Sequence, residues 1–363
     1  MARPKTVYHG GARPNWVLSL VLTVLMLVVL TGIWLFYDLQ QHLVYDKEGV
    51  RRVSPGMDLR SMSDGGGGYA SRQLPLIDVE IVVDKTDYSD ADGTDGEGLS
   101  PLHGHFIRKE HITGSVLNSF TYGLGSYNAL VLELMDSSGE LAWHSSVPLA
   151  ESYGVNGSFE LADYISLLKE KDVWLVAQLS ALCDGSMAVR NPPSALRNAD
   201  GSGIYLNDGQ GWLDPYSDVT RGYLTALMTE LAEMGFDEIL MTGFYLPQDG
   251  TYCFGGEMTE TPDGASAVSS LALYLRSQAD ALGLRLSGMA ERSTLANAEG
   301  ESVSQDLAVF FKAFDRVAYT ADYAPPEALR LLQEKRGDKG SGEARVVAVA
   351  SGRVPNLDSY IVK

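Results

Sequence analysis

The sequence predicts an α/β protein, namely a (β/α)8 TIM-like barrel preceded by one transmembrane helix and a flexible acidic stalk. Three observations lead to this prediction. Residues 16–37 form an apolar run without charge, and residues 38–105 are rich in glycine and acids. Residues 106–363 alternate between strand-like and helix-like segments. Such repeated alternation is typical of a parallel sheet covered by helices.

Residues 16–37 have the length of a membrane span. At about 1.5 Å of rise per residue, a helix of this length crosses a hydrocarbon layer roughly 30 Å thick. The tail before it, residues 1–15, carries three basic residues and no acid. The positive-inside rule therefore places this tail in the cytoplasm and the rest of the chain outside. The bulky exit at residues 34–38 is unlike a signal-peptidase site, so we expect an uncleaved single-pass anchor in the cell membrane.

The chain after the anchor is strongly acidic. Its formal charge is −22, because the first 37 residues carry +3 of the whole-chain −19. This charge disfavours nucleic acid and anionic lipid as partners and suits neutral or cationic ligands. The six histidines are scattered and show no zinc-ligand spacing with the two cysteines. We therefore expect neither a metal nor another cofactor.

Residues 38–105 are interpreted as a stalk. Four consecutive glycines at 65–68 and an acidic, glycine-rich segment at 84–98 are typical of linkers. One strand is expected between them, at residues 74–83. The acidic segment offers no register with both the glycine and the final acid that an EF-hand loop requires. A solvated linker is therefore the favoured interpretation.

The barrel domain, residues 106–363, is expected to contain eight strands separated by helices. Helices are expected at residues 158–171, at 219–234, at 265–282 and from the Pro325–Pro326 pair to about residue 336. The alternative is an open doubly wound sheet, but no glycine-rich phosphate loop follows the first strand. The expected strands are residues 112–117, 128–134, 173–179, 237–244, 284–289, 316–320, 345–350 and 360–362.

In such a barrel the active site lies where the strands end. The acids near these ends are Glu133, Asp136, Asp184, Asp214, Glu291 and Asp322, and the aromatic residues include Trp212, Tyr216 and Tyr245. Sugar rings stack on aromatic rings and their hydroxyl groups need acceptors, so this set predicts a carbohydrate-binding mouth. Any one acid taken alone is more often a loop cap or a solvated charge.

The two cysteines follow neighbouring predicted strands. Cys183 comes after the third strand and Cys253 after the fourth, so their loops are adjacent in a barrel. A disulfide between them and two free thiols are both open interpretations.

Several blocks of the sequence together resemble a known family. The blocks are NALVLE at 128–133, DSSG at 136–139, LLKEKDVWLVA at 167–177, NPPSALR at 191–197, WLDPY at 212–216 and GFDEI at 235–239. Their order and spacing are similar to those of the bacterial glycoside hydrolases of TIM-barrel type, many of them secreted or membrane-anchored, that were long filed as a domain of unknown function. The resemblance covers about residues 106–323. It implies the fold and a glycoside-hydrolase-like class, without an assigned substrate.

The chain departs from this family where the catalytic carboxylate is expected. In the family, the GFDEI motif leads to an aspartate at the end of the fourth strand, and here that position is Thr242. Tyr245 stands where the family has an arginine close to this aspartate. Met135 stands where the family has a lysine after the second strand, and Gln178 where it has an arginine in the third. A threonine cannot act as the carboxylate that most glycosidases need at such a point.

Three hypotheses follow from these departures. In the first, the domain is a catalytically degenerate barrel that binds cell-wall or capsular glycan without cleaving it. In the second, it is an active glycosidase that uses Glu291, Asp322 and Glu133 as relocated carboxylates. In the third, it is a structural or protein-binding exported domain, and side chains plug the barrel mouth.

Overall fold

The computed structural model divides the chain into two units, Met1–Glu80 and Ile81–Lys363. In the first unit it describes Met26, which is helical, and the backbone of an antiparallel hairpin formed by β1 (Leu43–Asp46) and β2 (Gly49–Arg52). In the second unit it describes residues 94, 96–248, 251–255, 263–302, 304–337, 342–354 and 357–363.

The predicted anchor falls almost entirely outside these residues. Of the span at 16–37 only Met26 is described, and the strand expected at 74–83 is not described at all. Within the described ranges, no helix combines the length and the apolar sequence needed to cross a bilayer.

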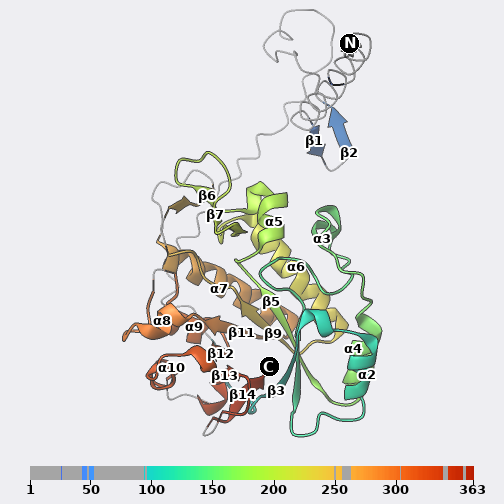
Figure 1. Cartoon of the computed structure of the whole chain (residues 1–363), viewed down its shortest axis with the longest axis vertical. Helices are drawn as coiled ribbons and strands as arrows, with labels where there is room; N and C mark the ends of the chain where they lie inside the picture. The colour runs from blue at the N-terminus through green and yellow to red at the C-terminus, as the bar shows by residue number, and fades with distance from the viewer. Residues whose placement is uncertain are drawn as a thin grey trace, which may run out of the picture. The chain divides into compact units, whose positions relative to one another are not determined.

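The second unit is built on a closed barrel of eight parallel strands (Figure 1). The strands follow one another around the barrel in chain order, and the last pairs with the first at Tyr360 and His103. The predicted (β/α)8 barrel is therefore confirmed. The strands are β3 (His103–Ile107), β4 (Ala129–Glu133), β5 (Trp174–Ser180), β9 (Glu238–Thr242), β11 (Arg285–Ala290), β12 (Arg316–Thr320), β13 (Val346–Ala350) and β14 (Ser359–Val362).

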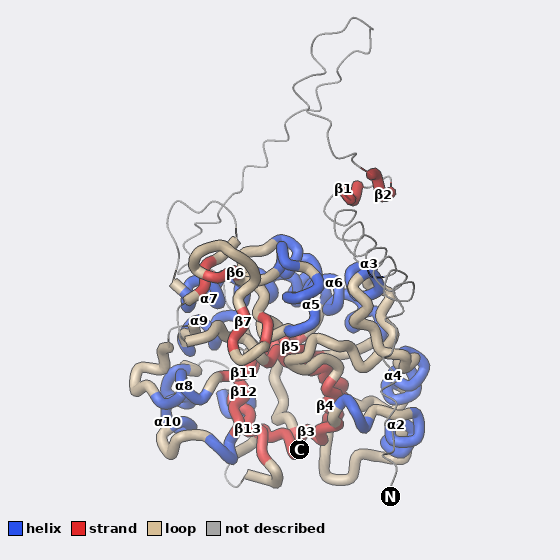
Figure 2. The backbone as a smooth tube through the Cα atoms, turned by 45° about the horizontal axis from the view of Figure 1, so that its top comes forward, coloured by secondary structure: helices blue, strands red, loops and turns tan. Residues whose placement is uncertain are grey.

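Helices surround these strands (Figure 2), except that the described residues between β13 and β14 contain none. The helices that return the chain to the next strand are α2 (Gly114–Phe120), α4 (Ala162–Lys169), α6 (Asp218–Met234), α7 (Gly264–Leu282), α9 (Leu307–Ala313) and α10 (Ala328–Lys335). Shorter elements decorate the loops after the strands: α3 (Pro148–Ser152), α5 (Gly185–Arg190), α8 (Arg292–Ala296), and two small sheets made by β6 (Arg197–Asn198) with β10 (Tyr252–Cys253) and by β7 (Leu206–Asn207) with β8 (Gln210–Gly211).

The two longest helices end as the sequence predicts. Gly235 and Gly283 follow α6 and α7 with positive φ angles of 105° and 69°, the left-handed conformation that glycine adopts without a Cβ clash. The side chain of Asp263 accepts a hydrogen bond from the backbone N–H of Ser266 and so caps the start of α7.

The first strand and one helix differ from the prediction. Residues 112–117 are not a strand, because Thr113 caps α2 by accepting from the N–H of Val116 and the chain continues as a helix. The first strand is β3. Histidine has little preference for strands, but the His103 ring stacks on the Tyr360 ring of β14, with 4.8 Å between the ring centroids. The helix expected at 158–171 is shorter and begins at Ala162 without a side-chain cap.

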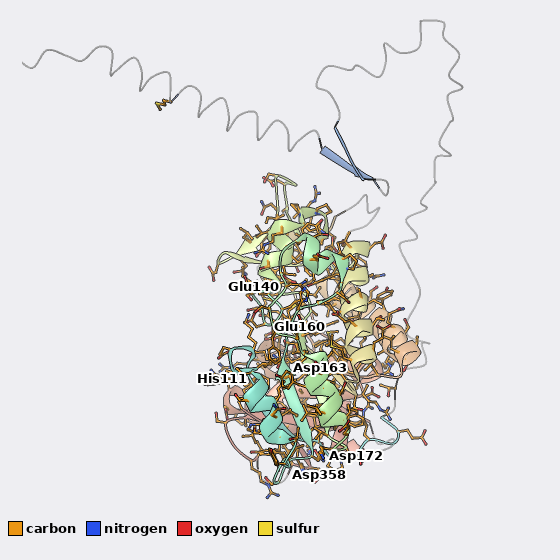
Figure 3. The ribbon with its side chains drawn as sticks, turned by 90° about the vertical axis from the view of Figure 1, so that its right-hand side faces the viewer. His111, Glu140, Glu160, Asp163, Asp172 and Asp358 are labelled. Atoms are coloured by element: carbon orange, nitrogen blue, oxygen red, sulfur yellow. The ribbon has the colours of Figure 1, made fainter. Side chains whose placement is uncertain are left out.

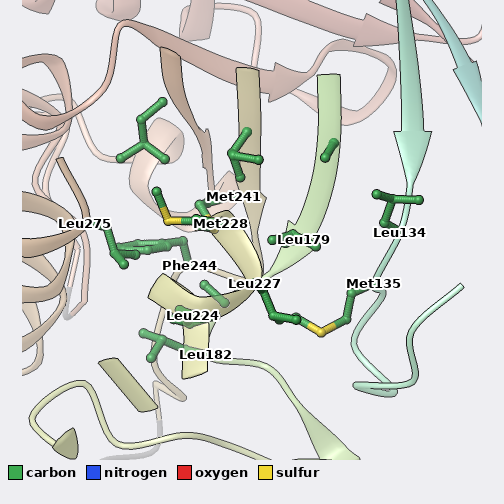
Figure 4. Packing of buried hydrophobic residues seen from close by; sticks show 14 of the residues in the cluster. Leu134, Met135, Leu179, Leu182, Leu224, Leu227, Met228, Met241, Phe244 and Leu275 are labelled. Atoms are coloured by element: carbon green, nitrogen blue, oxygen red, sulfur yellow. The ribbon is translucent and has the colours of Figure 1, made fainter. Parts of the chain in front are cut away.

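The core has two layers. The larger lies between the strands and the helices, and Figure 4 shows part of it around Leu179, Met228 and Phe244. The smaller fills the inside of the barrel with side chains from alternate strand positions, such as Val131, Val176 and Leu240. The barrel is therefore a packed core and not a pore.

The predicted stalk ends in a segment that docks on the barrel. Arginine side chains at the N-terminal ends of the strands hold its carbonyl groups: Arg345 donates to Thr94, Arg285 to Glu97 and Arg316 to Ser100, at 2.9–3.2 Å. We call residues 94–102 the basal strap. Its last residue, Leu102, is buried inside the barrel, so this part of the expected stalk belongs to the folded domain.

Candidate functional site

The mouth of the barrel is defined by the alternation of side chains along the strands. The apolar floor, made of the uppermost inward residues of the inner core, is Phe106, Val131, Val176, Leu240, Met289, Ala318, Val349 and Ile361. Because side chains alternate with a period of two, the residue two positions further along each strand also faces inward. These positions form the mouth ring, which is Arg108, Glu133, Gln178, Thr242, Glu291, Thr320, Ser351 and Lys363.

The two ends of the barrel are distinguished in Figure 3. Glu140 lies in the loop after β4, on the side of the mouth, whereas Asp172 and Asp358 precede β5 and β14 at the opposite end.

Glu133 and Asp136 occupy one side of the mouth. The Glu133 carboxylate accepts from the backbone N–H of Lys109 at 3.2 Å and from the Gln178 amide at 3.4 Å. Asp136 forms an ion pair with the Lys109 ammonium group, 2.8 Å between Oδ1 and Nζ. Burial opposes ionisation of Asp136, but the hydrogen bonds from Lys109 and Ser138 outweigh it and lower its pKa. Asp136 is therefore a partner of Lys109.

Glu291 lies on the other side of the mouth, directly after β11. Burial raises its pKa, and a hydrogen bond from the backbone of Arg292 only partly offsets this. Tyr245 is near enough that the Glu291 charge, second to burial, contributes to raising the phenol pKa to about 12. A half-buried carboxyl group with a raised pKa is the usual form of a proton donor in glycoside hydrolysis. Glu291 is thus the carboxyl group of the ring best suited to acid catalysis.

Asp184 and Asp214 are buried parts of the loop framework. Asp184 caps α5 by accepting from the Met187 N–H at 2.8 Å. Asp214 accepts from the Tyr216 N–H at 2.8 Å and from the Gly255 N–H at 2.6 Å, and so joins two loops. Burial raises the pKa of each carboxyl group to about 6. Their contacts in the structure are those of loop caps.

The predicted aromatic residues cluster above the fourth strand. Trp212 packs edge-on against Tyr245, 5.0 Å between ring centroids, and Tyr216 packs edge-on against Phe254 at 5.3 Å. Trp212 is only 5% exposed, so its ring is covered by protein. Tyr245 and Tyr216 are half-buried. The cluster is real, but Trp212 does not offer an open face in this structure.

The remaining predicted residues are Asp322 and the two cysteines. Asp322 is exposed after β12 and accepts from the N–H and the hydroxyl of Ser351, at 2.9 and 2.7 Å. Cys183 and Cys253 are free thiols. The disulfide does not form here, because Cys183 is buried beside Gly243 while Cys253, in β10, donates through Sγ to the Asn198 carbonyl at 3.2 Å. Burial, and next the charges of Asp184 and Glu291, raise the pKa of Cys183 to about 12, which makes it a poor nucleophile.

Two residues near the mouth were missed by sequence reasoning. Gln305 is fully buried and donates or accepts four hydrogen bonds around Glu291. Tyr323, in the short 3-10 helix η5 (Ala321–Tyr323) after β12, is 70% exposed and presents an open aromatic ring. Tyr323 could have been found, because it follows β12 directly, as Asp322 does. No local sequence pattern distinguishes Gln305.

A cavity lies at the other end of the barrel. Its volume is about 160 Å³ and it lies between the basal strap and the strand starts, lined by Leu99, Leu102, Asn128, Trp174 and Arg316 among others. It is therefore distant from the strand ends that carry the mouth ring. Among the described residues, no three side chains of His, Cys, Asp and Glu converge as metal ligands do.

The barrel fold agrees with a family assignment. Residues 115–319 match the family described as "Putative glycosyl hydrolase domain". Since this match spans more than half of the 363 residues, the chain belongs to that family. The resemblance found in the sequence blocks is thereby confirmed. A search of curated proteins found no significant match.

Solved structures with a similar fold are distant in sequence. A hypothetical protein from Ruminiclostridium thermocellum ATCC 27405 is 20% identical, with a TM-score of 0.44 over 50% of this chain and 95% of that one. The pneumococcal virulence factor StrH, studied for N-glycan recognition and hydrolysis, is 12% identical, with a TM-score of 0.46 over 73% and 79%. An inactive mutant of a Vibrio harveyi exo-β-N-acetylglucosaminidase is 12% identical, with a TM-score of 0.47 over 69% and 41%. These structures say nothing about the residues of the mouth.

Proposed function

We propose that this chain is a membrane-anchored, extracytoplasmic barrel whose mouth binds cell-envelope carbohydrate and does not cleave it. The observation that carries the proposal is the composition of the mouth ring. Its residues at the ends of β5 and β9 are Gln178 and Thr242, and its two carboxylates, Glu133 and Glu291, flank that pair. Amide, hydroxyl and carboxyl groups above an apolar floor suit the hydroxyl groups and ring faces of a sugar.

The residue at the end of the fourth strand supports binding without cleavage. Thr242 stands where the family resemblance places a catalytic aspartate, and a threonine cannot act as the carboxylate that most glycosidases need at such a point. The ring keeps two carboxylates, Glu133 on β4 and Glu291 after β11, and Glu133 accepts hydrogen bonds from the Lys109 N–H and the Gln178 amide.

The location of the protein belongs to the same proposal. The uncharged residues 16–37, with basic residues before them, support a single-pass anchor with a cytoplasmic N-terminus. The −22 charge of the remaining chain supports a soluble domain outside the membrane and partners other than nucleic acid.

Binding and cleavage can be separated in one experiment on the purified full-length chain. Soluble peptidoglycan fragments and capsular polysaccharide fragments serve as probes, with calorimetry for binding and a reducing-end assay for cleavage. We expect binding without release. Tyr323→Ala should weaken binding about fivefold if the ring stacks on sugar, since an aromatic contact contributes on the order of 1 kcal/mol. The matched control is Tyr122→Ala, a ring that is 95% exposed in the loop before β4, at the opposite end of the barrel.

The second candidate function is an active glycosidase, and the half-buried carboxyl group of Glu291 in the mouth ring is the observation that favours it. Release of reducing ends that Glu291→Gln abolishes would establish this function and refute the binding-only proposal. Neither binding nor release with any probe would refute both and favour a partner protein.

A further inference from the structure

Gln305 joins the ends of two neighbouring barrel strands. Its Oε1 accepts from the backbone N–H of Glu291 and from the hydroxyl of Thr294, both at 2.8 Å. Its Nε2 donates to the carbonyl oxygens of Phe244 at 2.9 Å and of Met289 at 3.2 Å. Two acceptor sites and two N–H donors are all that a glutamine amide possesses. The Gln305 side chain is therefore fully used, and it is completely buried.

These hydrogen bonds begin where the strand pairing stops. The ladder between β9 and β11 ends at Met241 and Gly288. Beyond that pair one segment continues to Phe244 and the other to Glu291, and Gln305 bonds to a backbone group of each. One side chain thus fixes the end of the fourth strand relative to the end of the fifth.

We propose that Gln305 is the positioning residue that fixes Glu291, at the end of β11, relative to the Phe244–Tyr245 segment that follows β9. The functional part of this inference rests on the proposed carbohydrate site. No other side chain of this size meets the same requirement. A glutamate would place a carboxylate against the two carbonyl oxygens, and a leucine would remove all four hydrogen bonds.

The first test needs no carbohydrate. The titration of the Glu291 carboxyl group is followed by NMR in the full-length chain, and its signal is assigned by its loss in Glu291→Gln. In Gln305→Leu the end of β11 is released, so Glu291 becomes more hydrated and its pKa should fall toward the ordinary value. Thr294→Val removes one hydrogen bond to Gln305 and should produce a smaller fall in the same direction. This milder variant decides the question if Gln305→Leu does not fold.

The control is a buried network that, among the described residues, shares no hydrogen bond with Gln305 or Glu291 and so should not act on them. Glu230 of α6 accepts hydrogen bonds from the Trp143 indole and from Ser145 and Ser146, at 2.5–3.2 Å. Glu230→Gln should lower stability and leave the Glu291 titration unchanged. If the Gln305 and Thr294 variants also lose stability but keep the wild-type Glu291 titration, Gln305 has a structural role only and the proposal is refuted.

The second test uses the carbohydrate probes. Gln305→Leu should weaken binding at least tenfold, because displacement of a site group by about 1 Å costs this much or more, whereas Glu230→Gln should not. If the wild-type chain binds none of the probes, the proposed function fails while the titration still decides the role of Gln305. If binding occurs and Gln305→Leu leaves both the affinity and the titration unchanged, the positioning role fails alone.

Discussion

Asp184 makes the stability of the barrel depend on pH in a direction that can be worked out. Its carboxyl group is fully buried, Oδ2 has no hydrogen-bond partner among the described residues, and burial raises the pKa from 3.8 to about 6. Each pKa unit corresponds to about 1.4 kcal/mol, so ionising this group in the folded chain costs about 3 kcal/mol. Because the folded state holds the proton more tightly, Asp184 stabilises the fold at low pH, and this contribution is lost as the pH rises from about 4 through about 6.

The perturbation is Asp184→Asn, which keeps an acceptor for the Met187 N–H and removes the titration. When the pH is lowered from about 7.5 to about 5, Asp184 should raise the free energy of unfolding of the wild-type chain by about 1.4 kcal/mol. The variant should lack this increase. For a domain of this size that difference corresponds to about 3–6 °C in the unfolding temperature. Asp214 has the same raised pKa, but it is unchanged in both chains and its effect cancels.

The assay is denaturant unfolding of the full-length chain at both pH values. Only the difference between the two pH values is compared, since Asp184→Asn also changes the stability at any single pH. Asp163→Asn is the control, because Asp163 is exposed on α4 (Figure 3). An Asp184→Asn variant with the same pH difference as the wild type would show that the buried carboxyl group does not titrate as argued.

Three further predictions concern buried groups and can be checked by denaturant unfolding. Glu230→Gln should cost about 2–4 kcal/mol, because an amide oxygen cannot accept all the hydrogen bonds of the carboxylate; a change below about 0.5 kcal/mol would contradict the network. Arg316→Met should cost about 3–5 kcal/mol by leaving Glu238 buried without its cation, and adding Glu238→Met should recover part of that loss. Gly288→Ala should destabilise by about 1–3 kcal/mol, because its Cβ would lie 2.4 Å from the Phe314 ring, whereas Gly222→Ala in α6 meets open space and should stabilise by about 1 kcal/mol.

Most of the barrel could be predicted because its strands and helices carry strong local patterns. The run at β4 is apolar up to its last residue, Glu133, and α6 and α7 each end at a glycine with positive φ. The first strand was missed because His103–Ile107 includes two histidines and a glycine, whose place in the sheet depends on contacts with β14 at the far end of the chain. Contacts so distant in sequence leave no local signal.

The site could be predicted only as a set of strand ends. The rule that the active site of a barrel lies at the strand ends led to Glu133, Glu291 and Tyr245, and the structure places these residues at the mouth. The same rule could not separate these from Asp184 and Asp214, because the difference is burial under loops of irregular structure. Gln305 was beyond reach for a similar reason, since its partners belong to two other segments of the chain, at Phe244 and at residues 289–294.

The basal strap and β3 determine how short the folded domain can be made. β3 is the strand that closes the barrel between β14 and β4. A truncation beginning at residue 106 would remove most of this strand and expose two unpaired strand edges, which readily pair with other chains. Such a fragment should aggregate, whereas one that begins just before Thr94 keeps the ring of strands closed and should remain monodisperse.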